Sequence, residues 1–207
     1  MLGQRKEGLT SHGIFLSVVL SLNFWTTGGF AADTYQIDPI HSSLGFAVQH
    51  LMVSTVKGEF TEYAGTIEFD QKNPSAFTAS VRIQSASIDT RNKQRDGHLK
   101  TGDFFDAEKF PEIVFKSKKL EPIEGNEYML TGDLTIRGIT KEISIPLSIA
   151  GPVNSPMGGQ VIGLSGETTI NRQDFGVSWN KALDSGGYVV SDEVKILVNI
   201  EASHKPS

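Results

Sequence analysis

Histidine, aspartate and serine are the residues of this chain that could do chemistry at an active site. His41, His50 and His98 lie beyond the first thirty residues, and Asp96 stands two positions before His98. Three imidazoles and a carboxylate are a sufficient ligand set for zinc. Their spacing matches no local ligand motif, such as two histidines four residues apart on a helix. We therefore expect no metal site, and we expect His41 and His50 to make structural hydrogen bonds at the ends of a strand.

A serine hydrolase site is also disfavoured. Ser42 directly follows His41, and Asp38 precedes both, but the sequence holds no Gly-x-Ser-x-Gly turn. Neighbouring residues of a strand point to opposite faces, so His41 and Ser42 cannot easily share a proton. We expect no catalytic residue.

Composition excludes further classes. The formal net charge of −5 disfavours general binding to nucleic acid. The chain has no cysteine, which excludes a disulfide, a thiol nucleophile and a cysteine metal site.

The first 31 residues have the order of a secretory signal peptide. Arg5 and Lys6 precede an apolar run over residues 14–25, and small residues follow at 28–32. The run is too short to cross a bilayer as a helix, which takes about 20 residues. We expect export, cleavage after Ala31 or Ala32, and one mature domain over residues 32–207.

Strand patterns dominate that domain. Residues 143–149 and 194–200 alternate apolar and other side chains with the period of two that places apolar groups on one face. Turn residues at 73–75, 124–126, 138 and 151–159 separate such runs. Many strands with short polar turns predict an antiparallel sandwich or barrel.

One segment, residues 89–111, breaks the strand pattern. We expect a helix over residues 91–99, capped by Asp89 or Thr90, and a second helical turn from Asp103 through Phe105. This helical excursion would cover one opening of the barrel. An eight-stranded barrel is just wide enough to be filled by side chains or to hold one small ligand, and these residues alone do not choose between the two.

Several ordered motifs together resemble the YceI-like family over about residues 35–202. The matching stretches are Tyr35 to Ser42, Phe46 to His50, Val56 to Phe60, Gly65, Ser87 to Lys100, Asp103 to Asp106, Phe110 to Pro111, Gly132 to Lys141 and Arg172 to Gly176. The resemblance implies a periplasmic protein with an elongated, eight-stranded, antiparallel, lipocalin-like barrel. It also implies binding of a polyisoprenoid, as an isoprenoid quinone or a polyprenyl phosphate, with no catalytic residue and no cofactor besides the bound lipid.

The resemblance further implies roles for particular residues. Polar residues would tie the excursion to the barrel rim, namely His41, Ser42, His50, Asp89, Arg95, Asp96 and His98. We expect apolar residues to line the ligand cavity, namely Phe46, Val48, Phe60, Leu99, Phe104, Phe105, Phe115, Leu134 and Ile136.

Three other functions remain open at this point. The barrel could bind fatty acids or fatty amides instead, could be a metal-dependent hydrolase using His41, His50 and His98, or could be a filled structural barrel. A lipid carrier would make transient contact with a membrane, and a homodimer also remains open.

Overall fold

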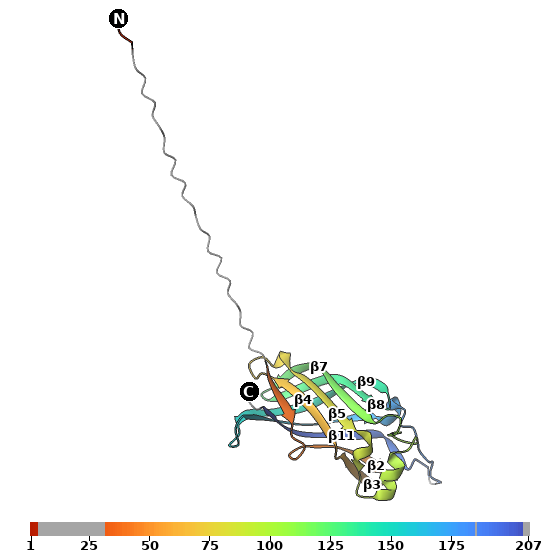
Figure 1. Cartoon of the computed structure of the whole chain (residues 1–207). Coiled ribbons are helices and arrows are strands. Elements are labelled where there is room, and N and C mark those ends of the chain that lie inside the picture. Colours follow the sequence, from red (N-terminus) through yellow and green to blue (C-terminus); the bar gives the residue numbers. More distant parts are fainter. Residues whose placement is uncertain (4–31, 185, 205–207) are drawn as a thin grey trace. The chain divides into compact units, whose positions relative to one another are not determined.

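The computed structural model describes residues 1–3, 32–184 and 186–204 (Figure 1). The predicted signal peptide lies outside the described residues, apart from its first three, so its cleavage stays a prediction. Beyond residue 32 the strands pair only antiparallel to one another. In the described part of the chain, no helix has the length and apolarity needed to span a membrane.

The elements follow one another in an order dominated by strands. They are β1 (Asp33–Ile37), β2 (Ser43–His50), β3 (Ser54–Phe60), β4 (Tyr63–Phe69), the 3-10 helix η1 (Pro74–Ala76), β5 (Thr78–Gln84), η2 (Ser85–Ser87), β6 (Ile88–Asp89), α1 (Lys93–Leu99), β7 (Glu112–Glu124), β8 (Glu127–Ile136), β9 (Ile139–Asn154), β10 (Gln160–Asn171), η3 (Arg172–Phe175) and β11 (Val190–His204).

Strand pairing closes the sheet into a barrel. β1 pairs with β4 on one side and with β11 on the other, which completes the ring β1–β4–β5–β7–β8–β9–β10–β11. The predicted eight-stranded antiparallel barrel is confirmed. Closure leaves no free edge in this ring, and a free strand edge is a site of aggregation.

Three of the eight wall positions are each shared by two short strands. β11 pairs with β1 near its C-terminal end and with β2 over the rest of its length. In the same way, β3 and β4 form one interrupted wall strand, and so do β5 and β6. The sheet order ends at β6, and there the chain leaves the wall as the predicted excursion, which contains α1 (Figure 1).

The helix of the excursion starts later than predicted. It covers Lys93–Leu99, and its N-cap is Asn92, whose side chain accepts the backbone N–H of Arg95 at 3.0 Å. The two caps that the sequence suggested have other partners: Asp89 accepts the N–H of Arg91, and Thr90 bonds to Asp96. Arg91 also has a φ of 63°, which is incompatible with a right-handed helix.

Two further local predictions were wrong. The segment after Asp103 forms turns rather than a second helical turn, because the guanidinium of Arg137 holds the carbonyls of Gly102 and Phe104. The loop predicted over residues 151–159 is shorter, since β9 continues to Asn154. A register shift opposite residues 150–153 accommodates Pro152 in the strand.

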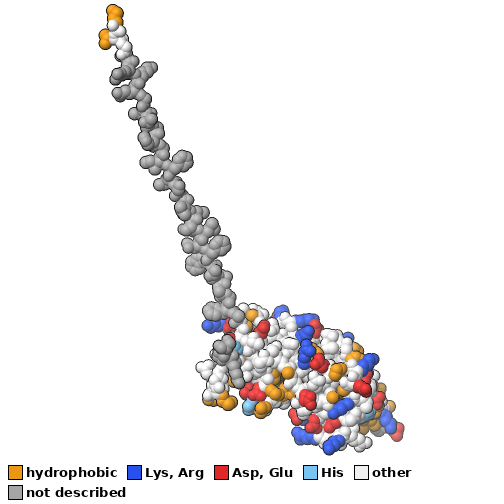
Figure 2. All heavy atoms as spheres, viewed as in Figure 1, with side chains coloured by type: hydrophobic (Ala, Val, Ile, Leu, Met, Phe, Trp, Pro, Cys, Tyr) orange, Lys and Arg blue, Asp and Glu red, His pale blue; other side chains and the backbone are white. Residues whose placement is uncertain are grey.

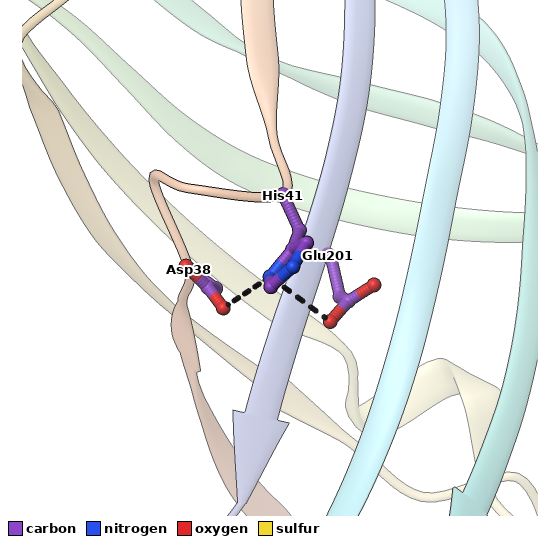
Figure 3. A group of neighbouring side chains, drawn as sticks. All are labelled: Asp38, His41 and Glu201. Atoms are coloured by element: carbon purple, nitrogen blue, oxygen red, sulfur yellow. Dashed lines mark hydrogen bonds and ion pairs between the residues drawn. The ribbon is translucent and has the colours of Figure 1, made fainter.

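The interruption between β1 and β2 is held by His41 and Ser42, and Figure 3 shows His41 between Asp38 and Glu201. The Ser42 hydroxyl donates to the carbonyl of Glu201 at 3.1 Å and accepts the N–H of Glu201 at 2.9 Å. The hydroxyl therefore takes the place of the backbone groups that a paired strand would offer to Glu201 of β11. The His41 imidazole lies 2.8 Å from the Asp38 carboxylate and 3.7 Å from that of Glu201.

This arrangement predicts that the stabilising interaction between His41 and Asp38 depends on pH. The hydrogen bond to Asp38, and then the charges of Asp38 and Glu201, raise the pKa of His41 above 6.5. The hydrogen bond from His41 lowers the pKa of Asp38 below 3.8. The contribution of His41 to stability is complete below pH 6.5 and is lost as pH rises through its raised pKa. That of Asp38 is complete above pH 3.8 and is lost as pH falls through its lowered pKa.

An NMR titration of the His41 ring checks this prediction. We expect a pKa above 6.5 in the wild type, a clear fall in Asp38→Asn, and a smaller fall in Glu201→Gln, because Glu201 is the weaker cause. An unchanged pKa in Asp38→Asn would show that the pair does not form.

Gly132 lets an aromatic ring lie against β8. A Cβ at this position would come within 2.5 Å of the Phe115 ring and 2.6 Å of the Lys116 carbonyl oxygen. Such separations are shorter than any carbon contact, so Phe115 can lie over β8 only because residue 132 has no side chain.

We predict opposite effects of alanine at two glycines. Gly132→Ala should destabilise the fold by about 1–3 kcal/mol, the usual range for overpacking. Gly97, in α1, has no neighbour within 4 Å of its Cβ position, so Gly97→Ala should stabilise by roughly 0.5–1 kcal/mol. Urea denaturation measures both, and equal effects at the two sites would contradict the packing described here.

Candidate binding cavity

The barrel encloses a cavity of about 630 Å³. This volume lies in the range of roughly 300–1,000 Å³ that is usual for ligand pockets. Because side chains alternate between the two faces of each strand, one face of β2, β5, β7, β8, β9, β10 and β11 supplies most of the wall of the cavity, and β1 supplies none of it. On β2, for example, Leu44, Phe46, Val48 and His50 line it.

One end of the cavity is closed by a layer of large buried residues. Tyr35, Phe69, Phe77 and Tyr128 are at most 8% exposed, belong to one hydrophobic cluster and are absent from the lining. Phe69 and Phe77 pack edge to face with their ring centres 6.3 Å apart. The adjacent layer of the lining contains Ala79, a small residue next to this plug on β5. The plug therefore sets the depth of the cavity.

The polar lining residues all lie at the other end. They come from the end of β2, from the excursion and from η3, namely Gln49, His50, Thr90, Asn92, Gln94, Arg95, His98 and Arg172. Apolar residues make up the deeper wall. We call this polar end the mouth of the cavity.

Aromatic rings line the wall beside the mouth. The His98 ring packs edge to face on Phe104 and on Trp179, with ring centres 5.0 and 5.1 Å apart. Phe105 packs edge to face on Phe60 at 5.8 Å. These contacts join the excursion to the segment after η3 and to β3.

Thr90 anchors the excursion where it leaves β6. Arg95 donates to the Thr90 hydroxyl at 2.7 Å and to its carbonyl at 2.8 Å, and Asp96 accepts from the hydroxyl and the N–H of Thr90. Burial alone would raise the pKa of Asp96, but the hydrogen bonds from Thr90 and the charge of Arg95 outweigh it and lower that pKa. The carboxylate is therefore ionised at neutral pH and can accept both bonds.

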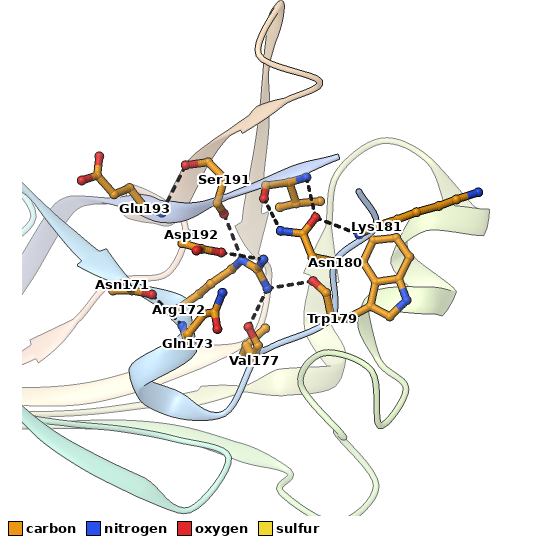
Figure 4. Close-up of polar contacts among 11 residues, drawn as sticks. Asn171, Arg172, Gln173, Val177, Trp179, Asn180, Lys181, Ser191, Asp192 and Glu193 are labelled. Carbon is orange, nitrogen blue, oxygen red and sulfur yellow. Dashed lines mark hydrogen bonds and ion pairs between the residues drawn. The ribbon is translucent and has the colours of Figure 1, made fainter. Parts of the chain in front are cut away.

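Arg172 anchors the segment on the other side of the mouth (Figure 4). This buried guanidinium donates to the carbonyls of Ser191, Val177 and Trp179 and to the Asp192 carboxylate, at 2.6 to 3.0 Å. Burial lowers the pKa of Arg172, and the Asp192 charge opposes that shift. Because its donors are engaged by the protein, we assign Arg172 a structural role.

The structure brings together the nine apolar residues that the sequence singled out. Phe46, Val48, Phe60, Leu99, Phe104, Phe105, Phe115, Leu134 and Ile136 all line the cavity. Whether they contact a ligand stays a prediction.

The seven polar residues, in contrast, do not form one cluster. Arg95 and Asp96 bind the excursion to Thr90 as expected, while His98 bonds to Asp103 within the excursion at 2.8 Å. Asp89 caps the turn at Arg91, and His50 lines the mouth. His41 and Ser42 instead hold the β1–β2 interruption, where they bond to Asp38 and Glu201.

The histidines of the hydrolase alternative lie apart. His41 and His50 stand before and at the end of β2, and an extended strand rises about 3.3 Å per residue. Within the described residues, the one group of three side chains close enough to share a metal is Asp38, His41 and Glu201. It lies on the outer side of the β1–β2 interruption, and none of its members lines the cavity.

Sequence reasoning missed much of the wall. Residues of β9, β10 and β11 also line the cavity, among them Ile143, Ile145, Leu147, Leu164, Ile196, Val198 and Ile200. Their alternation was visible in the sequence, and it would have identified them once the inward face was known.

Comparison with known proteins agrees with this geometry. A model of the YceI-like domain matches residues 35–202. UPF0312 protein SA2479 of Staphylococcus aureus is 40% identical over 170 residues, which cover 82% of this chain and 96% of that protein.

Solved structures show the same barrel. The YCEI protein of Campylobacter jejuni is 36% identical, with a TM-score of 0.66 over 76% of this chain and 90% of that one. A polyisoprenoid binding domain from Saccharophagus degradans, implicated in plant cell wall breakdown, shares the fold at 16% identity, with a TM-score of 0.64 over 82% and 98% of the two chains. With the family model spanning nearly the whole barrel and a relative at 40% identity, the chain belongs to the YceI-like family.

Proposed function

We propose that this chain is an exported, periplasmic carrier that holds a long-chain isoprenoid lipid, an isoprenoid quinone or a polyprenyl phosphate, in its barrel. The observation that carries the proposal is an enclosed apolar cavity whose polar lining is confined to one end. A lipid with an apolar tail and one polar headgroup has the same division. The fold neighbour from Saccharophagus degradans, described as a polyisoprenoid binding domain, supports the choice of lipid.

The lining suggests how such a lipid lies. The tail would occupy the deep, apolar part that ends at the plug, where each buried CH₂ contributes about 0.8 kcal/mol relative to water. The headgroup would lie at the mouth, among His50, Asn92, Gln94 and His98. No side chain is assigned a catalytic role in this proposal, and no cofactor besides the lipid is needed.

Lipid extraction and mass spectrometry of the protein purified from its native host test the proposal. We expect an isoprenoid in about equimolar amount. A fatty acid or a fatty amide in its place would support that alternative, and a protein without lipid would refute the carrier role.

We predict that Phe115→Asp strongly lowers lipid retention. Phe115 lines the cavity on β7, and an unpaired carboxylate in an apolar site is unfavourable by several kcal/mol. Retained lipid should fall roughly tenfold or more. Ile123→Asp is the matched control, because Ile123 is also on β7, is 58% exposed and does not line the cavity. Circular dichroism must show that both variants are folded, and equal retention would disprove the assignment.

Chain length offers a second test. Ala79→Phe should fill the deepest layer of the lining beside the plug and shorten the cavity. The bound lipids should then shift toward shorter tails in mass spectra, while the headgroup stays the same. An unchanged distribution of tail lengths would show that the tail does not reach the plug.

A further inference from the structure

The turn between β2 and β3 exposes three consecutive apolar side chains. Leu51, Met52 and Val53 are 36%, 61% and 83% exposed. Single apolar residues on a surface are ordinary, but a contiguous group is the usual mark of an interaction site. We call these three residues the apolar tip.

The backbone of the apolar tip would favour other residues. The N–H of Val53 donates to the carbonyl of His50, and the two central residues, Leu51 and Met52, have φ values of 53° and 60°. Turns with positive φ at both central positions are dominated by Gly, Asn and Asp. Bulky side chains at positive φ are unfavourable, so the local backbone conformation does not explain why leucine and methionine occupy this turn.

An exposed aromatic ring, that of Tyr188, lies beside the tip. The N–H of Leu51 donates to the carbonyl of Val189 at 2.9 Å, and a Cβ at Gly187 would lie 2.6 Å from the Met52 methyl group. Tyr188, between these two residues, is 59% exposed. An amphipathic tyrosine ring is typical of the boundary between lipid and water.

The loop that carries Tyr188 is held in place next to the tip. The Asn180 side chain bonds to both the N–H and the carbonyl of Val190, at 3.1 and 2.7 Å (Figure 4). Arg172 holds the residues on either side. The tip and Tyr188 therefore form one exposed apolar surface rather than two independent loops.

The surface stands at the mouth of the cavity. Gln49 and His50, directly before the tip, line the cavity, and so do Val189 and Val190, directly after Tyr188. β2, β3 and α1 lie at the same end of the barrel (Figure 1). The basic side chains of the excursion gather in residues 91–100, which carry four basic side chains and one acidic one, whereas residues 101–111 carry one basic and three acidic side chains. Figure 2 shows basic and acidic side chains mixed over the side of the barrel in view, including the end at which β2, β3 and α1 lie.

We propose that the apolar tip and Tyr188 dock the mouth of the barrel on an anionic lipid bilayer. The proposal rests on the lipid-carrier function and names the surface through which the lipid would pass. Leucine, methionine and tyrosine insert between headgroups, and the exposed Arg91 and Lys93 beside the mouth meet their negative charge. Docked in this way, the mouth opens on the membrane and the lipid does not cross water.

Single-cysteine labelling tests the docking at one site. The chain has no cysteine, so Val53→Cys in the full chain carries one environment-sensitive dye. We expect the dye emission to shift to the blue and brighten with vesicles of phosphatidylglycerol and phosphatidylethanolamine, and to change less with phosphatidylcholine or at high salt. The matched control is Ile123→Cys, exposed on β7 away from the mouth, which should not respond.

A variant with the preferred turn residues separates docking from folding. Leu51→Asn with Met52→Gly should leave the unfolding midpoint equal or higher, while binding to the anionic vesicles weakens roughly tenfold or more. The lipid that copurifies with this variant should be retained, and only its transfer to acceptor vesicles should slow.

Three results would overturn the docking proposal. They are no response at position 53, an equal response at position 123, and a response that follows protein concentration without vesicles, which would identify a second copy of the chain as the occupant. Each can occur with lipid still bound, so each differs from a failure of the carrier function, which is wild-type protein without lipid.

Discussion

The structure depends on an apolar interior that its own side chains do not fill. Protein cores are normally packed to crystal density. Cavities made by mutation are unfavourable by about 24 cal/mol per Å³, so an unfilled space of this size would be unfavourable on the order of 10 kcal/mol. That is comparable to the whole stability of a typical domain. Water is a poor occupant because the deep wall offers no hydrogen-bonding partners. The interior therefore favours an apolar guest.

The two ends of the barrel solve different problems with the same strands. At the closed end, Phe69 at the end of β4 packs on Phe77, which stands directly before the neighbouring strand β5, and the two rings form part of an ordinary core. At the mouth, the chain leaves the sheet after β6 and returns only at β7. Backbone groups there have lost their ladder partners, and unpaired buried groups are unfavourable. Thr90 and Arg172 fill this need, which explains charged side chains beside an apolar cavity.

The sequence predicted much of this fold, because a period of two is a local property. Alternation in residues 143–149 and 194–200 is enough to expect strands, and glycine at 138 is enough to expect a tight turn. The inward face is not local, since it depends on how eight strands close. The grouping of polar residues failed for the same reason: His41 and Ser42 lie on a strand interruption, which no pattern announces. Asn92 became the helix cap because Asp89 and Thr90 had other partners.

For a lipid carrier, the free energy of transfer depends more on the mouth of the cavity than on its interior. A lipid tail that moves from a bilayer into an equally apolar barrel gains little free energy, because both environments exclude water. Tight binding is therefore not the main requirement for a carrier. The unfavourable step is exposure of the tail between the two phases, at about 0.8 kcal/mol per CH₂. If the chain carries a lipid and docks as proposed, a mouth bordered by exposed apolar residues removes that step, and the unfavourable backbone conformation of Leu51 and Met52 then has a physical reason.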